Sequence, residues 1–372
     1  MALCVGPAFA LQNVANTSQK GSLLIFPKIT VDPEDFANTL IEVSNDEISP
    51  VHIVCYYVNE RKDRVDFDFT LTPKATVSWE VLTGSGDIAA PLFPSAGKFP
   101  GNAARGELIC FAVDAGALNQ IAFNNLIGTA TVVNLADKDA RQPRQGYRYN
   151  AWAFVARNAA GLPEADNVIQ GTPGKIQLTG LGAGTYDACP AYNIANFVPN
   201  FAIAGGVGTI DNDLSGVSCN QDLRQDFVLH LTKLQFTVWN VNEVSFTGSY
   251  ACVDSVFTVP FGAGETTVTP VTNRSNFDFS TLRTDNARFQ VKGVPSTQCP
   301  GPPPSEHAGL LGVLTSSVEL FSPLVDAKAK GTVEPSFAED FELGSTTQGA
   351  GAHPGFVWWD PGSVVLPGRH HR

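Results

Sequence analysis

TLIEVSND (39–46), PVHIVCYYV (50–58) and RGELICFAVD (105–114) return in altered form later in the chain. The later counterparts are LQFTVWNVNE (234–243), GSYACVDSV (248–256) and AGLLGVLTSSVE (308–319). Each set holds a strand that ends near Asn, a strand that carries a Cys, and a late apolar strand led by Gly. Self-similarity at this distance is typical of repeated structural units. It predicts an all-β chain of two tandem immunoglobulin-like β-sandwich units.

Composition and alternation favour the same fold class. The 372 residues include 34 Gly and 25 Pro but one Met, which is typical of many short strands joined by turns. Apolar and polar residues alternate through VDFDFTL (65–71) and VSWEV (77–81). The intervening TPKA (72–75) predicts the turn of a hairpin with one solvent-facing side.

The predicted strands divide the chain into four parts after its N-terminal leader. The first sandwich unit spans 21–156, and the second spans 226–325. Between them, 157–225 is rich in Gly, Pro and Asn and is interpreted as an elaborated connection that contains one disulfide. Residues 326–372 are interpreted as a loose tail. Its Trp358-Trp359 pair either docks as a strand on a neighbouring subunit or caps the molecule's own core.

The N-terminus predicts export. MALCVGPAFA (1–10) is apolar and ends in Ala8-Phe9-Ala10, the small-x-small pattern that signal peptidase cleaves. We interpret it as the remnant of a signal peptide, and the alternative is an ordinary apolar N-terminal strand. The expected location is periplasmic, secreted or on the outer cell surface.

The cysteines agree with export. Removing Cys4 with the leader leaves six, with no CxxC and no zinc-type spacing: Cys55, Cys110, Cys189, Cys219, Cys252 and Cys299. Fifteen connectivities are available to six cysteines. Chain order favours the pairs Cys55–Cys110, Cys189–Cys219 and Cys252–Cys299. Six buried free thiols in a cytosolic protein are the alternative.

Charge excludes some partners. Thirty-six acidic residues outnumber 24 basic ones, and the net charge of −12 leaves no basic patch for nucleic acid or an anionic membrane. No apolar run reaches about 18 residues, so no membrane span is expected.

One segment resembles a calcium loop. Asp211, Asp213 and Ser215 supply oxygen at positions 1, 3 and 5, Gly216 stands at position 6 and Asp222 at position 12. Calcium is the one cofactor that these residues suggest. The alternative is an ordinary turn, in which Asp, Asn and Gly residues are also common.

The order of several motifs resembles a group of uncharacterised exported proteins of Gram-negative bacteria. The motifs are GSLLIFPKI (21–29), DFTLTPKATVSWEV (68–81), RGELICFAVD (105–114), YDACP (186–190), SCNQDL (218–223), LQFTVWNVNE (234–243) and GLLGV (309–313). The resemblance implies export and a β-sandwich fold. It implies no activity and no catalytic residues.

These features predict a non-enzymatic structural or adhesive protein that forms part of a surface, matrix or filament. Its partners would be other copies of itself or cell-surface components. No nucleophile elbow, zinc-protease motif or phosphate loop is present. The alternative is a carbohydrate-binding module or a glycoside hydrolase. In that case Tyr147, Tyr149 and Trp152 would stack on sugar rings.

The oxidation state of the six cysteines tests the export prediction. Because three disulfides hold no thiol hydrogens, reduction should raise the intact mass by about six hydrogens. Losing one bridge should cost about 2–5 kcal/mol of stability. Intact-mass spectrometry before and after reduction measures the change. Rapid alkylation of Cys55 and Cys110 without reductant would contradict it.

Overall fold

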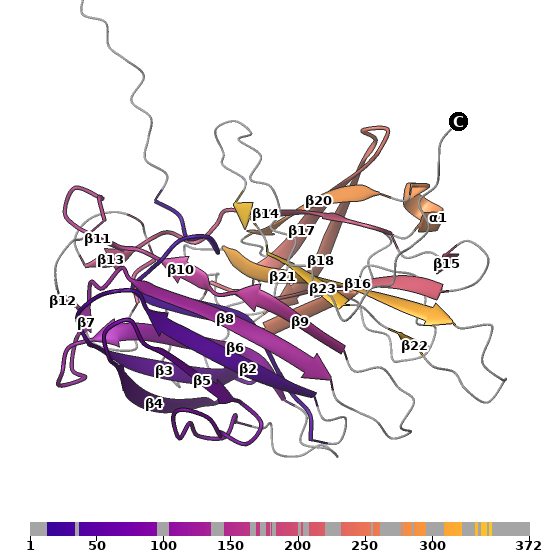
Figure 1. Ribbon diagram of the computed structural model, residues 1–372. Helices are drawn as coiled ribbons and strands as arrows, with labels where there is room; N and C mark the ends of the chain where they lie inside the picture. Colours follow the sequence, from indigo (N-terminus) through magenta and orange to yellow (C-terminus); the bar gives the residue numbers. More distant parts are fainter. Residues whose placement is uncertain are drawn as a thin grey trace, which may run out of the picture.

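The computed structural model is built almost entirely of antiparallel β-strands (Figure 1). The one helix among the described residues is the four-residue α1 (Phe279–Leu282). The predicted all-β class is confirmed. The structure describes residues 13–33, 37–94, 104–134, 145–163, 169–171, 176–178, 180, 184–199, 202–203, 208–219, 232–253, 256–260, 277, 279–284, 286–294, 309–321, 332–333, 336–340 and 342–343.

The β1 sheet has the order β10-β1-β6-β3-β4, with β7 and β12 attached beside β6. Its strands are β1 (Leu23–Val31), β3 (Val51–Asn59), β4 (Arg64–Leu71), β6 (Ala104–Val113), β7 (Gln120–Ile121), β10 (Trp152–Phe154) and β12 (Ile169–Gly171). The central strands are buried along almost their whole length, so both faces of this sheet are covered.

The β2 sheet covers one face of the β1 sheet. It has the order β5-β2-β8-β9 and consists of β2 (Ala37–Asn45), β5 (Thr76–Glu80), β8 (Leu126–Asn134) and β9 (Gln145–Asn150). Leu24, Phe26 and Tyr57 of the β1 sheet share a core with Ile41 and Trp79 of the β2 sheet. The Trp79 indole N–H donates a 2.6 Å hydrogen bond to the Tyr57 hydroxyl, which satisfies both buried polar tips.

The predicted hairpin at residues 65–81 is instead a corner between two sheets. β4 pairs with β3 in the β1 sheet, whereas β5 pairs with β2 in the β2 sheet. Phe67 and Phe69 therefore meet Trp79 across the core, with ring centroids 5.9 and 5.6 Å apart. Burial of these three rings against each other favours the corner over direct pairing.

Two further sheets form the second half of the fold. The β16 sheet contains β15 (Ala202–Ile203), β16 (Gly208–Ser218), β19 (Val256–Pro260), β21 (Leu310–Phe321), β22 (Thr332–Val333) and β23 (Ser336–Asp340). The β17 sheet has the order β18-β17-β20-β14-β24 and contains β14 (Asn193–Phe197), β17 (Thr232–Asn240), β18 (Ser245–Val253), β20 (Ala287–Val294) and β24 (Glu342–Leu343). A separate two-stranded sheet pairs β11 (Ala156–Arg157) with β13 (Thr185–Tyr186).

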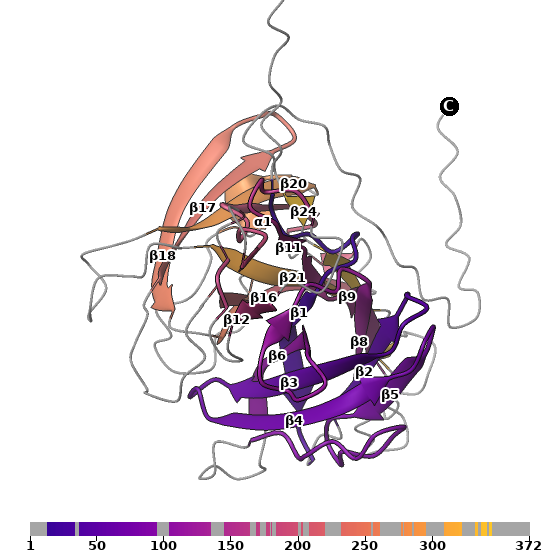
Figure 2. The ribbon, with the colours of Figure 1, turned by 90° about the vertical axis from the view of Figure 1, so that its left-hand side faces the viewer.

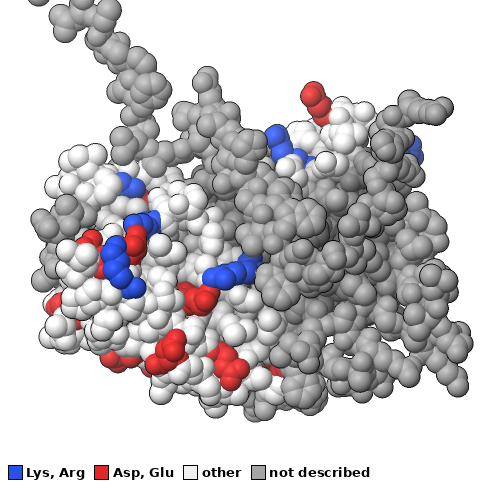
Figure 3. Space-filling model, viewed as in Figure 1, with Lys and Arg blue, Asp and Glu red and all other residues white. Residues whose placement is uncertain are grey.

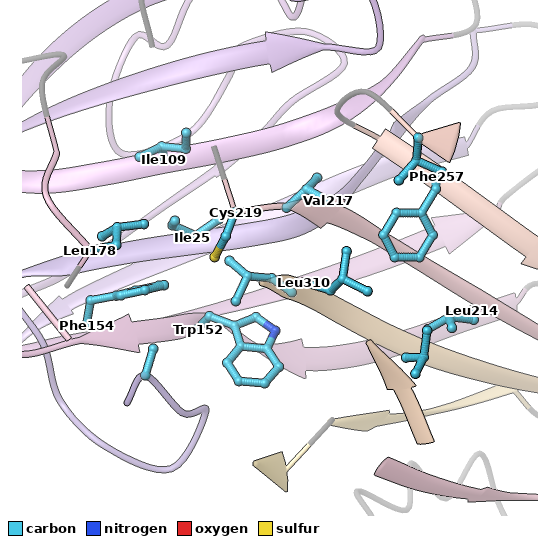
Figure 4. Packing of buried hydrophobic residues seen from close by; sticks show 14 of the residues in the cluster. Ile25, Ile109, Trp152, Phe154, Leu178, Leu214, Val217, Cys219, Phe257 and Leu310 are labelled. Atoms are coloured by element: carbon cyan, nitrogen blue, oxygen red, sulfur yellow. The ribbon is translucent and has the colours of Figure 1, made fainter. Parts of the chain in front are cut away.

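The second face of the β1 sheet packs toward the β16 sheet (Figure 2). Figure 4 shows Ile25, Ile109 and Trp152 in one cluster with Val217 and Leu310. The Trp152 indole N–H also donates to the Gly312 carbonyl at 3.3 Å. The two halves of the chain therefore share a continuous apolar core.

Strand pairing differs from the repeat proposed from sequence. β2 and β3 lie in different sheets, but their predicted counterparts β17 and β18 pair with each other. β14 and β16 fall inside the range 157–225, for which the sequence predicts a connection. Both are integral strands of the second half. Alternating apolar residues identify a strand, but they do not identify the strand with which it pairs.

Two predicted disulfides are present. Cys55 and Cys110 are direct cross-strand partners on β3 and β6, with Cα atoms 4.1 Å apart. Cys189 is bonded to Cys219. Cys252 is also disulfide-bonded. Its expected partner Cys299 lies outside the described residues, as do the leader 1–10 and the region around Trp358-Trp359.

Two buried carboxyl groups have contrasting surroundings. Asp187 is fully buried and accepts hydrogen bonds from Arg157 and from the Val155 backbone N–H. Burial raises its pKa, and these donors oppose that effect. Glu107 on β6 is 5% exposed and makes no hydrogen bond or ion pair with the described residues. Burial raises the pKa of Glu107 to about 8, against the opposing charge of Lys62.

Glu107 should make stability depend on pH. Between its ordinary pKa of 4.5 and about 8, the folded protein holds a proton that the unfolded chain has lost. Stability should therefore fall as pH rises through this window, by an amount on the order of a few kcal/mol. Glu107→Gln should remove that fall, as urea unfolding at pH 5 and pH 8.5 can measure. Glu60→Gln, at an exposed carboxylate, is the control. Parallel pH profiles for the native protein and Glu107→Gln would contradict the assignment.

Candidate functional site

A cavity of about 230 Å³ lies where the β1, β2 and β16 sheets meet. β1 runs beside β16 and β21 at this point. The walls combine apolar residues with hydroxyl groups and charges: Pro27, Lys28, Ile29, Thr30, Ala37, Arg105, Gly106, Val132, Val133, Tyr147, Asp213, Ser215, Val256, Thr258 and Thr315. Because these residues come from eight strands in both halves of the chain, the cavity exists only in the assembled fold.

A β-bulge in β1 forms one wall of the cavity. The register of β1 against β6 shifts between Phe26 and Ile29, so Pro27 and Lys28 leave the regular ladder. Proline has no N–H to donate, and bulges commonly redirect a side chain. The Tyr149 hydroxyl donates to the Lys28 carbonyl at 2.6 Å and accepts from the Lys28 N–H at 3.2 Å. Tyr149 is 1% exposed, so it replaces the lost ladder bonds inside the core.

The Lys28 side chain has two contacts at the cavity. Its ammonium donates to the Thr315 hydroxyl at 2.8 Å and lies 4.7 Å from the centre of the Tyr147 ring. Thr315 is buried, while Lys28 and Tyr147 are half-buried. The hydroxyl and the ring hold the ammonium in place without neutralising it. The cavity therefore contains a fixed positive charge.

The charge at the cavity contrasts with the acidic chain around it. Figure 3 shows acidic and basic side chains intermingled over the first half, as in the Glu42–Arg148 ion pair of the β2 sheet. Lys28 and Arg105 make no such ion pair with the described residues. Ser215, Thr258 and other hydroxyl groups add donors and acceptors. Chemically, the arrangement can hold a small polar ligand that carries negative charge.

The predicted calcium loop is not formed. Asp211, Asp213 and Ser215 lie in β16, which pairs with β21 without interruption from Gly208 to Ser218. Alternate residues of an extended strand stand too far apart to surround one ion as a curled loop does. Asp222 lies outside the described residues. Among the residues that the structure does describe, no three His, Cys, Asp or Glu side chains are grouped to hold a metal.

The aromatic residues proposed for sugar stacking separate into two kinds. Trp152 is fully buried and Tyr149 nearly so, which removes both from contact with a ligand. Tyr147 lines the cavity. Lys28 is a site residue that the sequence patterns above do not predict, although Pro27 within the strand-like LLIFPKI is a signal for a bulge at that position.

Comparison with known proteins assigns no family. No family model matches the chain, and no curated protein matches it. A cryo-EM structure of Broad Bean Stain Virus is among the solved structures that match. It shares 8% identity over 93% of this chain and 98% of that chain, with a TM-score of 0.16. A likeness at that score carries no argument. No helix in the described part of the chain is long and apolar enough to cross a membrane.

The hydroxyl of Tyr149 should matter more for stability than that of Tyr147. Tyr149→Phe leaves the N–H and C=O of Lys28 without their buried partner, and should cost about 1–3 kcal/mol. Tyr147→Phe keeps the ring at a half-buried position and should change stability by less than about 0.5 kcal/mol. Urea unfolding of both variants measures the difference. Equal effects would show that the bulge does not depend on Tyr149.

Proposed function

We propose that the chain is a non-enzymatic secreted or cell-surface structural protein, a subunit of a surface layer, matrix or filament. The observation that carries the proposal is the position of β18 at the edge of its sheet among the described strands. This nine-residue strand, SFTGSYACV, pairs with β17 and ends the β17 sheet within the described part of the chain. It contains no charged residue and no proline. Uncharged edges of this length invite strand addition from another molecule.

The edge at β4 provides a contrast within the same chain. β4 ends the β1 sheet but carries Arg64, Asp66 and Asp68, and both aspartates are exposed. Charged side chains along an edge are a common device against unwanted pairing. β18 lacks this protection. The difference supports β18 as the edge used for assembly.

Strand pairing in the first half supports an immunoglobulin-like unit within this proposal. β2 pairs with β5 in one sheet, while β3 lies between β4 and β6 in the other. Antiparallel strands divided between two facing sheets in this way are typical of that architecture. The Cys55–Cys110 bridge joins neighbours within one sheet, whereas antibody domains bridge their two sheets.

Export is part of the proposal. Two disulfides are compatible with a periplasmic or extracellular protein, because such bonds persist in oxidising compartments. The apolar leader 1–10 and the resemblance to exported Gram-negative proteins support the same location. A carbohydrate-binding role is the second candidate, and the cavity beside Tyr147 and Lys28 is the observation that favours it.

Assembly through β18 should respond to one edge substitution and one deletion. Thr247 is an exposed position on β18, and Thr247→Lys places a charge on the open edge. This variant should remain folded but lose self-association. We also propose the apolar segment 356–366 as the donor strand, so deletion of 344–372 should have the same effect. Analytical ultracentrifugation over a range of concentrations measures association.

Thr76→Lys, on the β5 edge of the β2 sheet, is the matched control and should associate like the native chain. A full-length protein that stays monomeric at high concentration would remove the filament proposal and favour carbohydrate binding. If the deletion unfolds the protein, the tail belongs to its own core and is not the donor.

A further inference from the structure

We infer that the cavity between β1 and β16 binds a single acidic sugar unit, a polyol ring that carries a carboxylate. This inference goes beyond the structural role and does not depend on self-association, because β18 does not line the cavity. It rests on the cation, the hydroxyl groups and the size of the cavity.

The cation selects for a negative ligand. Lys28 has three N–H donors, and Thr315 accepts one of them. The Tyr147 ring attracts the ammonium but offers no negative charge to pair with it. Arg105 adds a second cation at the same cavity, also without an ion pair to the described residues. These two cations outnumber Asp213, the one carboxylate among the described lining residues, so the net charge of the lining favours an anionic group there.

The remaining walls favour a polyol over a bare anion. Thr30, Ser215 and Thr258 contribute hydroxyl groups that donate and accept hydrogen bonds. Asp213 also lines the cavity, so a bare anion would meet a like charge there. The Tyr147 ring supplies the apolar surface against which sugar rings pack.

The size of the cavity limits the ligand. Its 230 Å³ is smaller than the roughly 300–1,000 Å³ of pockets for drug-sized molecules. This space suits one sugar ring and excludes an oligosaccharide. A longer chain could place only one terminal unit inside.

The cavity is built before a ligand arrives. Tyr149 fixes the bulge through both backbone groups of Lys28, and Thr315 fixes the ammonium from the other half of the chain. Because the Lys28 side chain is already held in this way, it loses little conformational freedom when a ligand binds.

Calorimetric titration with D-glucuronate, D-glucose and acetate tests the inference. Glucuronate should bind at least about tenfold more tightly than either glucose, which lacks the carboxylate, or acetate, which lacks the ring. Binding should weaken as salt is raised, because part of the attraction is between exposed charges. Acetate binding as tightly as glucuronate would overturn the assignment to a sugar. So would no detectable heat with glucuronate at tens of millimolar.

Variants localise the binding. Lys28→Met keeps the length of the side chain without the charge and should weaken glucuronate binding by about tenfold or more. Arg105→Met, at an exposed side chain, should weaken it less and provides a second test if Lys28→Met does not fold. Lys74→Met removes an exposed lysine that pairs with Asp46 and should leave binding unchanged. Unchanged glucuronate binding in both Lys28→Met and Arg105→Met would overturn the assignment of the binding to this cavity.

A uronate polymer added in the same titration distinguishes the two sources of the ligand. Binding that scales with the concentration of chain ends indicates terminal units of a polysaccharide. Binding of free glucuronate alone indicates a soluble sugar acid. Either result supports the acidic-sugar site. If Lys28→Met loses the binding of both the polymer and free glucuronate, both ligands bind in this cavity.

Discussion

The β1 sheet must bury both of its faces, and the rest of the structure depends on that requirement. Leu24 and Phe26 of β1 face the β2 sheet, while Leu23 and Ile25 face the core shared with the second half. Burying each such side chain contributes roughly 1.5–3 kcal/mol. Without the β16 sheet, the second face would expose Ile109, Phe111, Trp152 and their neighbours to water. The first half is therefore a poor independent domain.

The same requirement explains why the bulge at Pro27 and Lys28 is tolerated. A strand buried on both faces has no solvent to satisfy broken ladder bonds, so an interior bulge needs internal partners. Tyr149 supplies a donor and an acceptor to one residue, which is the smallest repair that the break allows. Because Lys28 cannot be buried deeply with its charge, the surrounding layers leave space around it. The cavity and its cation thus follow from one irregularity in β1.

Sequence patterns identified most of the strands but few of their neighbours. Alternation located β4 and β5, yet their separation into two sheets follows from the meeting of Phe67, Phe69 and Trp79 across the core. The sequence from Asp211 to Gly216 fits a calcium loop, but β16 pairs with β21 at eleven consecutive residues, which holds this segment extended. Chain order did predict Cys55–Cys110 and Cys189–Cys219. The cavity could not be predicted, because Lys28 and Thr315 are 287 residues apart and meet only after the halves pack.

The open edge of β18 and the cavity at Lys28 make different physical demands. Strand addition uses backbone hydrogen bonds along an uncharged edge and tolerates many donor sequences. The cavity uses a fixed cation and hydroxyl groups from several strands, so it discriminates between ligands by charge and size. An assembled surface protein can combine the two, because neither β17 nor β18 contributes to the lining. In such an assembly each subunit would present a separate weak site, and repetition of that site along a surface would raise the avidity only for a ligand with several terminal acidic units, such as a branched polysaccharide.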